Sequence, residues 1–157
     1  MIKYISSQNP SDCCGCRACE QICSHNALRF NEDKEGFLYP VLDADKCVDC
    51  GLCEKVCPMM KPSEVLYEEG EAYAAQYSNV EDLKTSSSGG GFIAIAKYVI
   101  ANNGVIYGAA YQNGPKVAHE RVDSLNGLER LKGSKYVQSD TMDTYKHIRM
   151  DLKSGRI

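Results

Sequence analysis

The chain has 157 residues and a formal net charge of −3 at neutral pH, and 43% of its residues are hydrophobic and 25% charged. This composition is typical of a globular protein with one medium domain or two small ones. The slightly acidic balance gives no reason to expect a nucleic-acid or anionic-membrane partner. No apolar run reaches the roughly 18 residues of a membrane span. The first residues also lack the apolar core of an export signal, so we expect a cytoplasmic protein.

Nine cysteines stand out, and all of them lie between Cys13 and Cys57. An odd number of cysteines without an export signal argues against a disulfide framework and favours metal ligation. Eight of the nine form an internal repeat with a shift of 34 residues. The repeat places Cys13, Cys16, Cys19 and Cys23 on Cys47, Cys50, Cys53 and Cys57. Two copies of one supersecondary unit that share a core are therefore expected.

Each copy has the spacing Cys-x2-Cys-x2-Cys-x3-Cys, and the second copy ends in Pro58. This run is typical of bacterial two-cluster iron–sulfur proteins, in which the fourth cysteine of one run binds the other cluster. We therefore predict two [4Fe–4S] clusters with crossed ligands. The predicted ligands of cluster one are Cys13, Cys16, Cys19 and Cys57. The predicted ligands of cluster two are Cys47, Cys50, Cys53 and Cys23.

Two alternatives for the cysteines remain, a zinc ribbon and a disulfide framework. A zinc ribbon would use two Cys-x2-Cys pairs and would leave four cysteines without a role. Cys14 lies outside the repeat, either as a small apolar neighbour of a cluster or as a redox or alternative ligand.

The residues around the cysteines predict short regular elements. Apolar residues on both sides of the polar turn 31–36 predict a β-hairpin over residues 28–41. Residues 17–22 and 52–56 are expected to form single helical turns. Pro58 and Pro62 mark a linker, so we place a first domain at residues 1–62 and a second at 63–157.

The second domain has no cysteine and a mixed pattern of predicted elements. Residues 72–77 and 105–111 are expected to be strands, and residues 116–122 the hairpin partner of the latter. Residues 92–101 are apolar nearly all round and predict a buried helix that ends at Asn102-Asn103-Gly104. Helical spacing from Met142 to Leu152 predicts a last helix with Ser139 or Asp140 as its N-cap. The expected fold class is α+β, a ferredoxin-like internal repeat with a second, truncated α/β domain.

Two resemblances add to these patterns. Residues 1–62 resemble two-cluster 2[4Fe–4S] ferredoxins. Three later segments resemble the N-terminal part of the coenzyme F420 hydrogenase/dehydrogenase beta-subunit family. They are TSSSGGGF at 85–92, GVIYGAAY at 104–111 and LKGSKYVQS at 131–139.

The second resemblance implies an iron–sulfur flavoprotein oxidoreductase in which clusters exchange electrons with FAD. The residues that it implies for flavin binding are Ser88, Gly89, Gly90, Gly133, Ser134 and Lys135. The alternative for these residues is a loop and a turn with a surface lysine. The family continues with a further strand, a Thr-Pro-Cys loop and a long reductase portion that this sequence lacks, so catalysis is expected to need a C-terminal reductase portion or a redox partner protein.

Two other functions fit the same residues. One is a non-catalytic ferredoxin-type electron carrier whose second domain docks a partner. The other is a structural or interaction protein in which the clusters hold the fold together.

Overall fold

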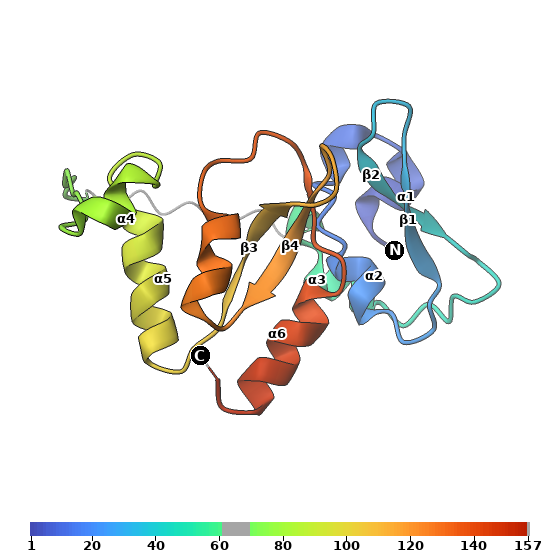
Figure 1. The fold of residues 1–157 in the computed structure, drawn as a ribbon. Helices are drawn as coiled ribbons and strands as arrows, with labels where there is room; N and C mark the ends of the chain where they lie inside the picture. Colours follow the sequence, from blue (N-terminus) through green and yellow to red (C-terminus); the bar gives the residue numbers. More distant parts are fainter. Residues whose placement is uncertain (61–69, 157) are drawn as a thin grey trace. The chain divides into compact units, whose positions relative to one another are not determined.

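The computed structural model describes residues 1–60 and 70–156, and the chain divides into two compact units, residues 1–67 and 68–157. The predicted domain boundary at 62/63 lies outside the described residues. Both units contain helices and small sheets, which confirms a mixed α+β fold (Figure 1). Among the helices described, none has the length and apolar character needed to cross a membrane.

The first unit is built from short elements around one hairpin (Figure 1). The predicted hairpin is confirmed, because β1 (Leu28–Glu32) pairs antiparallel with β2 (Leu38–Leu42). Its turn is stabilised by Asp33, whose carboxylate accepts hydrogen bonds from the backbone N–H groups of Glu35 and Phe37, both at 2.9 Å. The helical elements are α1 (Lys3–Ser7), η1 (Pro10–Asp12), α2 (Ala18–Ile22), α3 (Leu52–Val56) and η2 (Pro58–Met60).

The two predicted helical turns are confirmed as α2 and α3, and their backbones repeat as the cysteines do. The residue before each helix is left-handed, with φ of 57° at Arg17 and 71° at Gly51. The residue after each helix is extended, with φ and ψ of −74° and 102° at Cys23 and −77° and 118° at Cys57. The two helices pack against each other. The last cysteine of each copy therefore leaves its helix with the same geometry.

The second unit is a three-stranded sheet with helices on both faces (Figure 1). Strand β3 (Ile106–Tyr111) pairs antiparallel with β4 (Val117–Val122), as predicted, and β4 pairs parallel with the two-residue β5 (Ser139–Asp140). The helices are α4 (Val80–Lys84), α5 (Gly91–Ala101), the 3₁₀ helix η3 (Leu125–Leu131) and α6 (Thr144–Lys153).

One face of this sheet carries the apolar core. Its buried members come from α5, η3 and the two long strands: Ile93, Ala96, Ala110, Val122, Leu128 and Leu131. The predicted helix is present as α5 and ends at Asn102, but the prediction that it is buried on all sides is wrong. Ile95 and Tyr98 are 67% and 72% exposed, so only one stripe of the helix faces the core.

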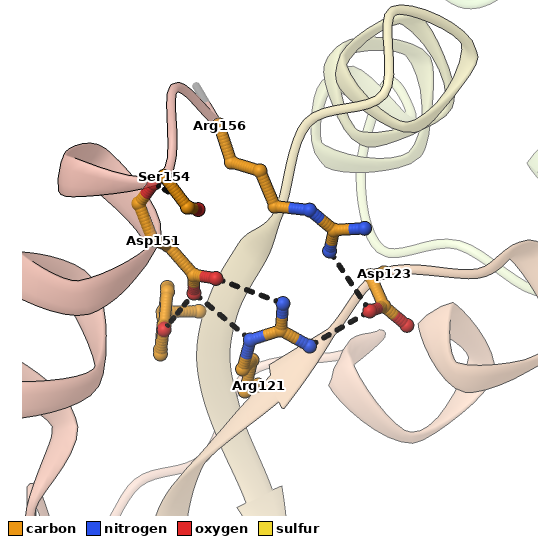
Figure 2. Close-up of polar contacts among 6 residues, drawn as sticks. Arg121, Asp123, Asp151, Ser154 and Arg156 are labelled. Carbon is orange, nitrogen blue, oxygen red and sulfur yellow. Dashed lines mark hydrogen bonds and ion pairs between the residues drawn. The ribbon is translucent and has the colours of Figure 1, made fainter.

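The opposite face of the sheet holds α6 through an ion-pair network (Figure 2). Arg121 of β4 forms a bidentate pair with Asp151 of α6, with N–O distances of 2.8 and 2.9 Å. The hydroxyl of Tyr107 on β3 also donates to Asp151. Asp123 accepts from Arg121 at 2.8 Å and from Arg156 at 3.0 Å. The hydrogen bonds from Arg121 and Tyr107 lower the pKa of Asp151 to about 2. Burial, and then the hydrogen bond to Asp151, raise the pKa of Tyr107 to about 12.

Two predictions for this unit are wrong. Residues 72–77 form no strand; the backbone N–H of Tyr77 donates to the carbonyl of Gly89 at 2.8 Å, and this segment joins neither described sheet. The last helix begins at Thr144 with Asp143 as its N-cap position, because Ser139 and Asp140 are taken up by β5.

Gly89 lies where the chain leaves no room for a side chain. A Cβ atom there would come within 2.2 Å of the carbonyl oxygen of Ala75. Two residues on, at the first position of α5, a Cβ on Gly91 would meet nothing within 4 Å. Packing therefore requires glycine at position 89, whereas position 91 has room for a side chain.

We expect Gly89→Ala to lower the free energy of unfolding of the second unit by about 1–3 kcal/mol, because the backbone must move away from Ala75. Gly91→Ala should be neutral or stabilising by up to about 1 kcal/mol, because alanine favours a helix. Chemical denaturation of the two variants beside the wild type measures both. Equal stability of the two variants would contradict the close approach at Gly89.

We expect Asp151→Asn to loosen α6 at neutral pH. The pKa of Asp151 is lowered in the folded state, so its ionic contribution is present above its ordinary pKa near 4 and is lost as the pH falls toward about 2. Hydrogen exchange of α6 peptides, read by mass spectrometry, should be faster in the variant at pH 7 and should converge with the wild type near pH 2. Glu81→Gln is the control, since Glu81 is 82% exposed and pairs with Lys84 within α4, away from α6. Its exchange should equal that of the wild type, and unchanged exchange in Asp151→Asn would count against the network.

Candidate functional site

The eight repeated cysteines of the first unit lie around two cavities, four at each. Cavity one takes three of its cysteines from the first copy and one from the second. Its lining residues are Cys13, Cys14, Cys16, Cys19 and Cys57 with Ile2, Tyr4, Asp12, Phe30 and Met59. The geometry of the chain after α3 thus brings Cys57 to the loop that carries the first three cysteines.

Cavity two has the reverse arrangement. Its cysteines are Cys47, Cys50 and Cys53 from the second copy and Cys23 from the first. The other lining residues are mostly apolar and include Met1, Ile2, Ile5, Ala27, Leu28, Leu42, Val48 and Leu52. The structure therefore brings together the same two sets of four cysteines that the spacing predicts.

Burial disfavours the thiolate form at several of these positions. It raises the pKa of Cys16 to about 11 and that of Cys19 to about 12, and it raises the pKa of Cys13 and Cys53 as well. Because metals bind the thiolate, ligation at these cavities must release protons.

Backbone N–H groups already point at one cysteine sulfur of each cavity, Cys13 at cavity one and Cys23 at cavity two. The N–H of Gly15 donates to the sulfur of Cys13 at 3.4 Å, and the N–H of Ala27 donates to that of Cys23 at 3.3 Å. Such bonds stabilise negative charge on sulfur and are one of the means by which proteins set the potential of a cluster.

The thiols are arranged as a four-iron cluster requires. Within residues 1–60 and 70–156, no three His, Cys, Asp or Glu side chains come close enough together to bind one metal ion. In a cubane each iron takes one thiolate at its own corner, so the ligands surround a body instead of converging on a point. Four thiols around each cavity match that requirement.

Cys14, which the repeat leaves over, is exposed and also lines cavity one. It lies close enough to Cys16 for their side chains to hydrogen bond. Cavity one is therefore lined by five thiols and cavity two by four.

In the second unit, the Ser-Gly loop and the 131–134 segment form one hollow of about 250 Å³. Its lining residues are Ser86, Ser87, Gly90, Phe92, Leu131, Lys132, Gly133 and Ser134. Three of the six residues that the flavin resemblance implies are among them, namely Gly90, Gly133 and Ser134. The other three, Ser88, Gly89 and Lys135, are not.

The cation at this hollow is Lys132, which the sequence did not single out. Its side chain is 6% exposed, and its ammonium group contacts Glu129 and Thr85, both at 2.7 Å. The ammonium group of Lys135 instead lies within 2.7–3.2 Å of four backbone carbonyl oxygens at the end of η3, to which its three N–H groups donate, and burial lowers its pKa. The carbonyls at the end of a 3₁₀ helix attract a cation as those of an α-helix do. Lys135 therefore caps η3.

Comparison with known proteins supports iron–sulfur clusters in the first unit. Residues 12–60 match a 4Fe-4S dicluster domain, and residues 39–113 match a second family model with the same description. The part of the second match beyond Cys57 contains no cysteine. Over 44 residues the chain is 39% identical to the ferredoxin-type protein NapF of Haemophilus influenzae. This stretch covers 28% of the chain and 25% of NapF, so the chain spans about a quarter of that relative's length.

The thiol-lined cavities and these matches concern the same residues. All eight repeated cysteines lie inside the 12–60 match. The N-terminal unit therefore contains a 4Fe-4S dicluster domain, and this match supports an iron–sulfur electron carrier.

Proposed function

We propose that the chain is the electron-transferring part of an iron–sulfur flavoprotein of the coenzyme F420 hydrogenase/dehydrogenase beta-subunit type. In this proposal Cys13, Cys16, Cys19 and Cys57 hold one [4Fe–4S] cluster, and Cys47, Cys50, Cys53 and Cys23 hold the other. The observation that carries the ligand assignment is the composition of the cavities, each with three cysteines of one copy and the last cysteine of the other.

The residues of the first unit have defined tasks in this proposal. A bound [4Fe–4S] cluster supplies one-electron chemistry. The cysteines hold it, and the N–H groups of Gly15 and Ala27 stabilise negative charge on their sulfur atoms. Buried apolar side chains line part of each cavity, Ile2 and Tyr4 at cavity one and Ile2 and Leu28 at cavity two. They lower the local dielectric constant there, so each N–H contact counts for more.

For the second unit we propose that the hollow beside Lys132 holds the anionic part of FAD. Support comes from its small polar residues and from a nearly buried cation. The hollow measures about 250 Å³, which is less than the roughly 300–1,000 Å³ of pockets for drug-sized ligands. FAD would therefore need further surface, which a C-terminal reductase portion or a redox partner protein would supply.

Double variants test the crossed ligand sets. Anaerobically prepared protein should contain about eight irons and as much acid-labile sulfide. Cys57→Ser combined with Cys16→Ser removes two ligands of the same cluster, so about four irons should remain. Cys57→Ser combined with Cys50→Ser removes ligands from both clusters, so both should be lost. Iron and sulfide analysis with low-temperature EPR of the reduced protein measures the outcome.

An uncrossed arrangement predicts the opposite result, with about four irons left in the variant that changes Cys57 and Cys50. Cys14→Ser is the control, and it should keep both clusters because the repeat does not include Cys14. Zinc in place of iron in the wild type would overturn the proposal as a whole.

Flavin retention tests the role of the second unit. Protein purified with FAD should keep it through gel filtration. Lys132→Gln should weaken FAD binding about ten-fold, the value of one charge-assisted contact. Lys146→Gln makes the same charge change at an exposed position of α6 and should leave FAD binding unchanged. A wild-type chain that binds no FAD would favour the ferredoxin-type carrier whose second unit docks a partner.

A further inference from the structure

Ile2 is the one residue that lines both thiol-lined cavities in the described part of the chain. It precedes the 12–60 match and the cysteine repeat, so neither points to it. Its side chain is 3% exposed and belongs to the buried cluster with Cys19 and Leu28. Cys53 and Cys57 are also packed against this cluster. Ile2 thus lies among cysteines of both predicted ligand sets.

The backbone of Ile2 contributes as well. Its N–H forms a hydrogen bond with the sulfur of Cys53, a cysteine of cavity two. Its carbonyl accepts from the N–H of Ile5 at 3.1 Å, at the start of α1. The position of Ile2 is therefore fixed on one side by a thiol and on the other by a helix.

Helix α1 is itself held in place by contacts to the rest of the unit. The ring of Tyr4 stacks on that of Tyr39 in β2, with centroids 5.0 Å apart. The Lys3 ammonium pairs with Asp12 at 2.6 Å. These two contacts attach α1 to the hairpin and to the residue just before Cys13. A β-branched side chain has few rotamers, so Ile2 is a rigid apolar group at this place.

We propose that Ile2 is a positioning residue that separates the two cluster sites from water and thereby sets both reduction potentials. This rests on the proposal that both cavities hold clusters. Reduction adds negative charge, and water near a cluster stabilises that charge and raises the potential. One residue that lines both cavities affects both potentials, whereas a residue that lines a single cavity affects one.

The experiment compares three variants with the wild type in the full chain, loaded with clusters under anaerobic conditions. Redox titration followed by EPR gives the two potentials of each protein. Ile2→Ala opens space at both cavities and should shift both potentials to more positive values. Ile5→Ala changes a residue of cavity two alone and should shift one of them. Met59→Ala changes a residue of cavity one alone and should shift the other.

A shift of a single potential, or of neither, in Ile2→Ala with its iron retained would overturn the inference. If Ile2→Ala does not keep about eight irons, the same test is made with Ile2→Val. This variant removes only one methylene group, so both potentials should shift in the same direction by a smaller amount. Failure of the wild type to bind about eight irons defeats the proposed function itself. A loaded wild type with unmoved potentials in the Ile2 variants defeats this inference alone.

Discussion

The first unit depends on one constraint, which is that each cavity is built from both copies of the cysteine repeat. The left-handed residue before each short helix and the extended residue after it send the last cysteine of one copy to the cavity of the other. The buried core of this unit consists of cavity lining, with Cys19 between Ile2 and Leu28. So small a core stabilises a fold weakly by itself. In the proposed ligand arrangement, ligation across the two copies would supply cohesion that apolar burial does not.

The second unit is stabilised differently on its two faces. Apolar packing fastens α5 and η3 to the sheet, and Leu128 and Ile93 are each 1% exposed there. On the other face, Asp151 accepts hydrogen bonds from the guanidinium of Arg121 (Figure 2) and from the hydroxyl of Tyr107. A bidentate pair fixes the orientation of a helix more strictly than apolar contact does.

Local patterns predicted the fold of the first unit well, since cysteine spacing and turn chemistry act over a few residues. They failed where a hydrogen-bond partner far away in the sequence decides the local structure. Residues 72–77 have strand-like composition, yet their hydrogen bond goes to Gly89 and to no neighbouring strand. Ser139 and Asp140 look like a helix cap but pair with β4. Lys135 and Lys132 are three residues apart on one turn, and only the fold shows which of them reaches the hollow.

The order in which the cavity residues occur along the chain has a consequence for biosynthesis. The four cysteines of cavity two have all been made at Cys53, and those of cavity one only at Cys57. Cys13, Cys16 and Cys19 are therefore synthesised well before Cys57, with the whole hairpin and the second cysteine loop in between. Until then these thiols are open to oxidation and to stray metal ions. In the proposed arrangement, neither cluster could gain its full ligand set before Cys53, and both sets are complete within the next four residues of elongation.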